Sequence, residues 1–172
     1  MSVRLYVLDT SYLVELAGCS REGHTVARDN VRRRFAEAFR KGGRFFAPLP
    51  CIFELGDHIA DVRHDAERAR LVAWLIETVR TCLEKSDPWL ITPTERPEEV
   101  LPRLMKCFEP LAIQHRIGLV DSFAAEEGLR LKLKYDRFKG KIHIWTNDIG
   151  LKKLEPDPEP DPYLWKADGS PR

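Results

Sequence analysis

Residues 5–11 read LYVLDTS, and this stretch decides the fold. The almost purely apolar run Leu5–Leu8 predicts a strand buried on both faces, which is typical of a parallel sheet. Asp9 comes directly after this strand, and ligands of open α/β sheets bind just beyond the carboxyl ends of the strands. The stretch therefore predicts a parallel sheet with a carboxylate at its ligand-binding edge.

The rest of the chain alternates strand-like and helical patterns. We expect further strands at Arg44–Ala47, Trp89–Thr92 and Lys141–Thr146. Between and after them, apolar residues at helical spacing and a Gly42-Gly43 stop signal predict helices, namely Tyr12–Leu16, Val31–Lys41, Pro50–His64, Asp65–Leu83, Glu98–Gln114 and Leu119–Lys134. Such alternation predicts a three-layer α/β/α sandwich with a mainly parallel central sheet.

Residues 155–172 differ in composition from residues 1–154. They begin with an alternation of acid and proline, EPDPEPDP, which excludes a helix or a central strand. We therefore divide the chain into one α/β domain, 1–154, and an extended proline- and acid-rich tail, 155–172, that is either free or wrapped on the surface.

Composition narrows the class of protein. The chain of 172 residues is 43% hydrophobic and 32% charged, as expected for one globular domain. Its net charge of +1 argues against capture of nucleic acid by the whole molecule, although residues 28–44 and 130–141 are locally basic. The four cysteines form no CxxC motif, and neither a signal peptide nor a membrane span is evident. We expect a cytoplasmic protein that does not bind membranes.

Three further acids stand in settings comparable to that of Asp9. Glu54 lies one turn into the helix after the second strand, Asp121 lies in the first turn of the 119–134 helix, and Asp148 follows the last strand. Carboxylate oxygens are the ligands that Mg²⁺ and Mn²⁺ prefer. The four acids together predict a divalent-metal centre assembled from distant parts of the chain, able to hold one ion through waters or two ions.

Each acid also has a purely structural interpretation. Asp9 and Asp148 would fit polar turns, Glu54 a solvated helix face, and Asp121 a favourable charge at a helix N-terminus. The hypothesis of a metal centre depends on their combination, because two follow strands, two lie early in helices, and all have apolar neighbours.

The combination resembles the PIN-domain ribonucleases over nearly the whole chain, from Val3 to about Leu154. Four short motifs in order carry the resemblance: Leu8-Asp9-Thr10-Ser11, Ile52-Phe53-Glu54-Leu55, Leu119-Val120-Asp121-Ser122-Phe123-Ala124 and Ile144-Trp145-Thr146-Asn147-Asp148.

The resemblance implies a function and a set of site residues. Asp9, Glu54, Asp121 and Asp148 would be the metal-binding and catalytic acids, and Ser11 and Thr146 would support them. The implied activity is Mg²⁺- or Mn²⁺-dependent hydrolysis of RNA that leaves a 5′-phosphate. Many bacterial members are VapC-type toxins, so the resemblance also implies a homodimer silenced by a small antitoxin protein.

Other interpretations stay open at this point. The chain would also fit a catalytically inert PIN-like module that binds RNA or protein, although it keeps all four acids. A haloacid-dehalogenase-like phosphatase needs a second acid where Ser11 stands. Asp57, His58 and Asp61 share a helix face with Glu54, and we expect them to support Glu54 or to lie in solvent rather than to form a second metal cluster.

Overall fold

The computed structural model describes residues 3–19 and 25–159. Within these residues the chain forms a four-stranded sheet in the order β3-β2-β1-β4. All three strand pairs are parallel. The strands are β1 (Arg4–Leu8), β2 (Arg44–Pro48), β3 (Leu90–Thr92) and β4 (Lys141–Trp145). The first strand is thus central, so the residues that follow it lie in the middle of the sheet edge.

The strands are connected by helices, as parallel neighbours require. The helices are α1 (Thr10–Ala17), α2 (Thr25–Arg40), α3 (Leu49–Ala60), α4 (Asp65–Lys85), α5 (Pro97–His115), α6 (Leu119–Tyr135) and the short α7 (Ile149–Lys152). A 3-10 turn, η1 (Asp136–Phe138), follows α6.

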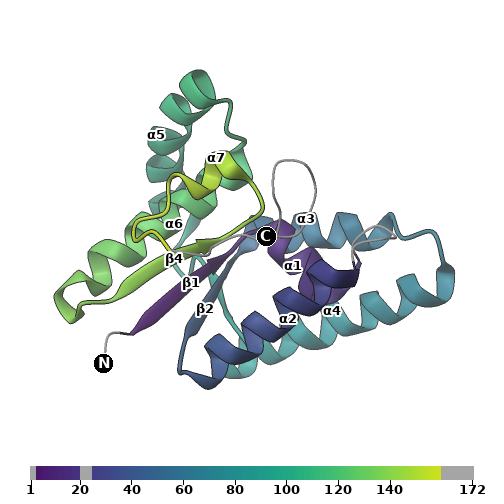
Figure 1. Ribbon diagram of the computed structural model, residues 1–172. Coiled ribbons are helices and arrows are strands. Elements are labelled where there is room, and N and C mark those ends of the chain that lie inside the picture. Colours follow the sequence, from purple (N-terminus) through teal and green to yellow (C-terminus); the bar gives the residue numbers. More distant parts are fainter. Residues whose placement is uncertain (1–2, 20–24, 160–172) are drawn as a thin grey trace.

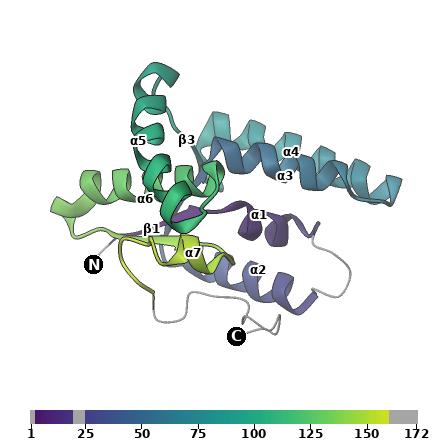
Figure 2. The ribbon, with the colours of Figure 1, turned by 90° about the horizontal axis from the view of Figure 1, so that it is seen from above.

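The helices cover both faces of the sheet. Figure 1 shows α1 to α4 on one side and the green helices α5 and α6 on the other, and Figure 2 shows α3 and α4 running alongside each other. Leu5 and Val7 belong to the apolar cluster on the α6 side, whereas Tyr6 and Leu8 belong to the cluster on the side of α1 to α4. Because successive strand residues point to opposite faces, a strand covered on both sides has to be apolar throughout. The predicted three-layer α/β/α sandwich is confirmed.

The predicted elements are confirmed with shifts of up to four residues at their ends, except that α2 begins at Thr25 rather than at the predicted Val31. The Gly42-Gly43 stop follows α2, and Gly42 adopts a φ of 79°. Pro102 and Pro110 lie inside the continuous helix α5, although proline usually interrupts a helix. The sequence analysis missed α7, a helix of four residues that Asp148 begins as its N-cap.

The first five residues of the acid–proline tail lie against the sheet. The backbone N–H of Asp157 donates to the carbonyl of Ile142 at 3.1 Å, next to the free edge of β4. This part of the tail is therefore wrapped on the domain, whereas residues 160–172 of the predicted tail lie outside the described residues.

Two further observations concern the state of the four cysteines and the apolarity of the helices. Cys19, Cys51, Cys82 and Cys107 are all free thiols, and Cys51 and Cys82 are buried. Over the described ranges, no helix combines the length and apolarity needed to cross a bilayer.

Candidate metal centre

The ends of two adjacent strands bring Asp9 and Asp148 to the same edge of the sheet. β1 and β4 pair in register, with Leu8 opposite Trp145, and the backbone N–H of Asp9 donates to the Trp145 carbonyl at 3.1 Å. Beyond this point the chain turns into α1 after Asp9 and into α7 after Asp148. Each acid is the N-cap of the helix that follows it.

Two hydroxyl groups join these strand ends into one network. Oδ2 of Asp9 accepts hydrogen bonds from Ser11 Oγ at 2.7 Å and from Thr146 Oγ1 at 2.8 Å. The same hydroxyls accept from the next segment, because Asn147 N donates to Ser11 Oγ at 3.0 Å and Asp148 N donates to Thr146 Oγ1 at 2.9 Å. Ser11 and Thr146 therefore orient the acid groups, and their hydroxyl protons are already donated to a carboxylate.

Glu54 is attached to the same edge through Thr10. The Thr10 hydroxyl donates to Glu54 Oε2 at 2.7 Å, and this contact links α1 to α3. Thr10 is buried at 5% exposure, whereas Glu54 is partly exposed. The sequence analysis did not list Thr10 as a site residue. Its position next to Asp9 was the available signal, but its partner 44 residues away was not predictable from spacing.

Asp121 is the fourth acid of the group, and its pKa depends on the charges of the other three acids. Burial, followed by the charges of Asp9, Asp148 and Glu54, raises the pKa of Asp121 from 3.8 to about 6. The charges of Asp9, Asp148 and Glu54 therefore reach Asp121, although the four acids come from α1, α3, α6 and α7 or the residues preceding them. Like charges gathered at one place favour either a proton or a cation between them.

The four carboxylates suit a hard divalent cation. One oxygen of each of three acids is engaged by the protein: Asp9 Oδ2, Glu54 Oε2 and, through Leu151 N at 2.7 Å, Asp148 Oδ1. Within the described residues, the second oxygen of each of these groups accepts no hydrogen bond. Burial falls from Asp9, at 5% exposure, to the exposed Asp148, so the group opens from the sheet edge toward solvent. An all-oxygen donor set of this kind fits Mg²⁺ or Mn²⁺ with waters completing the shell.

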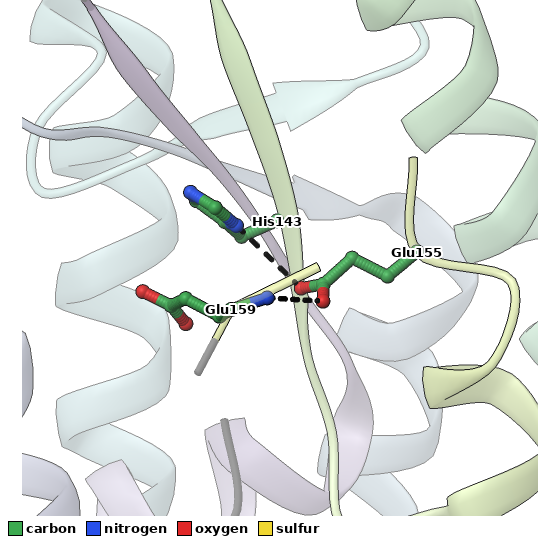
Figure 3. A group of neighbouring side chains, drawn as sticks. All are labelled: His143, Glu155 and Glu159. Atoms are coloured by element: carbon green, nitrogen blue, oxygen red, sulfur yellow. Dashed lines mark hydrogen bonds and ion pairs between the residues drawn. The ribbon is translucent and has the colours of Figure 1, made fainter. Parts of the chain in front are cut away.

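A different trio has the closest approach of ligand atoms. Among the described residues, His143, Glu155 and Glu159 are the group whose potential ligand atoms all lie within 4.8 Å of one another. His143 comes from β4, and the two acids come from the start of the tail (Figure 3). No ligand role was predicted for these residues, because no local spacing pattern relates the tail acids to His143.

The atoms of this trio are already committed to protein partners. His143 Nδ1 lies 2.8 Å from the Asp157 carbonyl, which only accepts, so this ring nitrogen carries a proton. Glu155 accepts from the backbone N–H groups of Ile144 and Glu159, and Figure 3 shows that this Glu159 nitrogen faces the Glu155 carboxylate. The trio is best described as a hydrogen-bonded attachment of the tail.

The Glu159 carboxylate is engaged in the same way. Its Oε2 accepts from the indole N–H of Trp145 at 2.9 Å and from Arg34 at 3.3 Å. The Arg34 guanidinium also lies over the Trp145 ring, 5.5 Å from its centroid. Through these contacts the tail is attached both to β4 and to α2.

The basic segments and the group of Asp57, His58 and Asp61 are less organised for binding. Several of the basic side chains are used within the protein, since Arg32 donates to the Leu16 carbonyl and Arg130 pairs with Glu127. Asp57, His58 and Asp61 are exposed and form no trio of close ligand atoms within the described residues.

Comparison with known proteins adds no assignment. No protein-family model matches this chain, and no curated protein matches it either. The functional conclusion therefore rests on the geometry of the acid group formed by Asp9, Glu54, Asp121 and Asp148.

Proposed function

We propose that this chain is a divalent-metal-dependent ribonuclease whose site is the acid group of Asp9, Glu54, Asp121 and Asp148. Mg²⁺ or Mn²⁺ bound there would supply charge neutralisation on an RNA phosphodiester and activation of a water molecule. The likeness of the four motifs to PIN-domain ribonucleases supports RNA as the substrate.

One observation carries the proposal above all others. Asp121 has a pKa of about 6 because it is partly buried and faces the charges of three other acids from three different segments. Concentrating four carboxylates destabilises a protein in the absence of a cation, and functional sites are where such perturbed groups gather. A separate structural role for each acid does not explain why the charges of the other three acids reach Asp121.

The protein's own groups have separate tasks in this proposal. Asp9 is held rigidly by the Ser11 and Thr146 hydroxyls, so its position at the end of β1 is preorganised. Thr10 orients Glu54. A cation bound beside Asp121 would lower its raised pKa and so favour its ionised form.

The direct test is cleavage of a mixed RNA pool. The native protein and Asp9→Asn are incubated with the pool in Mn²⁺ and then in EDTA, and the 5′ ends of the fragments are analysed. We expect cleavage by the native protein in Mn²⁺ only, with 5′-phosphate ends, and at least a hundredfold loss in Asp9→Asn. The matched control is Asp57→Asn, since Asp57 is an exposed acid on the same helix as Glu54, and it should cleave like the native protein.

The outcomes separate enzyme from binding module. Equal cleavage by native protein and Asp9→Asn would identify a contaminating nuclease. If no metal supports cleavage, a Mn²⁺ titration of the same two proteins decides further. Saturable binding lost in Asp9→Asn would indicate a selective enzyme, and no binding by either protein would refute the proposed metal centre.

A further inference from the structure

The acid–proline alternation of the tail has a structural explanation. The outward-facing N–H groups of the edge strand β4 are satisfied by side chains, because Ile144 N donates to Glu155 Oε1 at 2.8 Å and Ile142 N donates to Asp157 Oδ2 at 2.9 Å. Proline between the acids has no N–H to offer a further strand. Carboxylates at alternate positions therefore replace a neighbouring strand and close the edge of the sheet.

Glu155 pairs with a lysine of α7, whereas Asp157 pairs with Lys132 of α6 and Lys141 of β4. The Glu155 carboxylate pairs with the Lys152 ammonium, and both side chains are 3% exposed. Lys152 Nζ also donates to the carbonyl of Ile144 at 2.7 Å. The pair thus engages both the N–H and the C=O of one residue of β4, and it ties the end of α7 to that residue.

The segment between these attachment points contains two site residues. Thr146 and Asp148 lie between Ile144 and Lys152, in the turn that leads from β4 into α7. α7 has four residues, and a single helical turn is unstable unless other contacts hold it. Its Asp148 cap begins the turn, and the Lys152–Glu155 pair secures its end.

We propose that Lys152 and Glu155 are positioning residues that hold Thr146 and Asp148 in the geometry needed to receive the divalent cation. The inference rests on the proposed function, because it assigns the pair a role in that metal centre. The Lys152 backbone N–H donates to the Asp148 carbonyl at 2.9 Å, and the side-chain pair acts on the site through the β4–α7 turn. Outer groups that orient metal ligands commonly change metal affinity by about 10- to 100-fold when they are altered.

The chain offers a matched pair of variants. Glu155→Gln and Asp157→Asn each neutralise a tail carboxylate that accepts a β4 edge N–H and pairs with a lysine, Lys152 or Lys132. Only Glu155 is connected to α7. The double variant Lys152→Met/Glu155→Gln removes both charges, so no unpaired charge remains buried if Glu155→Gln alone fails to fold.

Two readouts test the proposal on the full chain. Hydrogen exchange of the metal-free proteins should show at least tenfold faster exchange over residues 146–152 in Glu155→Gln or the double variant, and not in Asp157→Asn. Mn²⁺ titration should show affinity weakened on the order of tenfold in the same variants, with cleavage at saturating Mn²⁺ close to native. This split between metal affinity and maximal rate is what a loosened ligand segment predicts, and global destabilisation would not produce it.

The possible failures are distinguishable. Unchanged exchange over residues 146–152, or equal weakening of Mn²⁺ binding by Asp157→Asn, would overturn the positioning role while the proposed function stood. A native protein that binds no Mn²⁺ would overturn the proposed function and the role in metal binding together.

Discussion

Asp121→Asn should stabilise the metal-free protein at neutral pH. Burial and the charges of Asp9, Asp148 and Glu54 raise the pKa of Asp121 from 3.8 to about 6. This rise of roughly two pH units corresponds to at most about 3 kcal/mol of native-state free energy, at about 1.4 kcal/mol for each. Because Asp121 is only partly buried, solvent screening reduces the figure to roughly 1–2 kcal/mol.

If Asp121 acts only by stabilising helix α6, its substitution should destabilise the protein instead. Asp121 lies in the first turn of α6, where a negative charge stabilises the helix by about 0.3–1 kcal/mol. Subtracting this contribution leaves a net gain of about 1 kcal/mol for Asp121→Asn. If Asp121 served only the helix dipole, the same substitution would destabilise the protein by a few tenths of a kcal/mol or more.

The pH dependence follows from the direction of the pKa change. The folded-state pKa of Asp121 lies above the unfolded value, so the folded protein binds more protons between pH 3.8 and about 6. The stability of the native protein is highest, as far as Asp121 is concerned, below this window and falls as pH rises through it. The advantage of Asp121→Asn should therefore be fully present at about pH 7.5 and roughly halved at about pH 5, which lies midway through this window.

Urea denaturation in EDTA at these two pH values measures the effect. The matched control is Glu98→Gln, because Glu98 is an exposed acid in the first turn of α5, and it should lose a few tenths of a kcal/mol. Added Mn²⁺ should stabilise the native protein and not Asp121→Asn. A destabilised Asp121→Asn at pH 7.5, comparable to Glu98→Gln, would refute the electrostatic argument for the acid group.

Three further predictions concern the network and the core. Thr146→Val should lower the free energy of unfolding, measured by urea denaturation, by about 1–3 kcal/mol. The reason is that the hydroxyl that donates to Asp9 and accepts from Asp148 N is lost. A decrease below about 0.5 kcal/mol would contradict the hydrogen-bond network. In the same assay, Leu55→Ala, at a fully buried position, should lower the free energy of unfolding by about 2–5 kcal/mol. Phe53→Ala, at 63% exposure, should change it by no more than about 0.5 kcal/mol. Similar decreases for both variants would contradict the placement of α3. The Cys51 thiol is fully buried and burial raises its pKa, so mass spectrometry should detect its alkylation at about pH 8 only after denaturant is added.

The layered fold was predictable from sequence because its signals are local. An apolar run such as Leu5–Leu8 can be satisfied only by a strand covered on both faces, and a stop such as Gly42-Gly43 ends a helix wherever it folds. Pro102 and Pro110 show the limit of local rules, since α5 continues through both. The four acids were predicted from their places after strands and early in helices, and the resemblance of four short motifs added Ser11 and Thr146.

The tertiary structure decided which of these groups meet. That Thr10 bonds to Glu54, and that Asp121 feels three other acids, depends on how strands and helices pack, and no spacing along the chain encodes it. The tail shows the same division. Its alternating acids and prolines were sufficient to exclude a helix and a central strand, but the partners of its carboxylates are the free N–H groups of an edge strand, and β4 becomes an edge only when the strand order is set. Local propensity determines the elements, and long-range packing determines the site, because hydrogen bonds and charges act through space between residues that sequence separates widely.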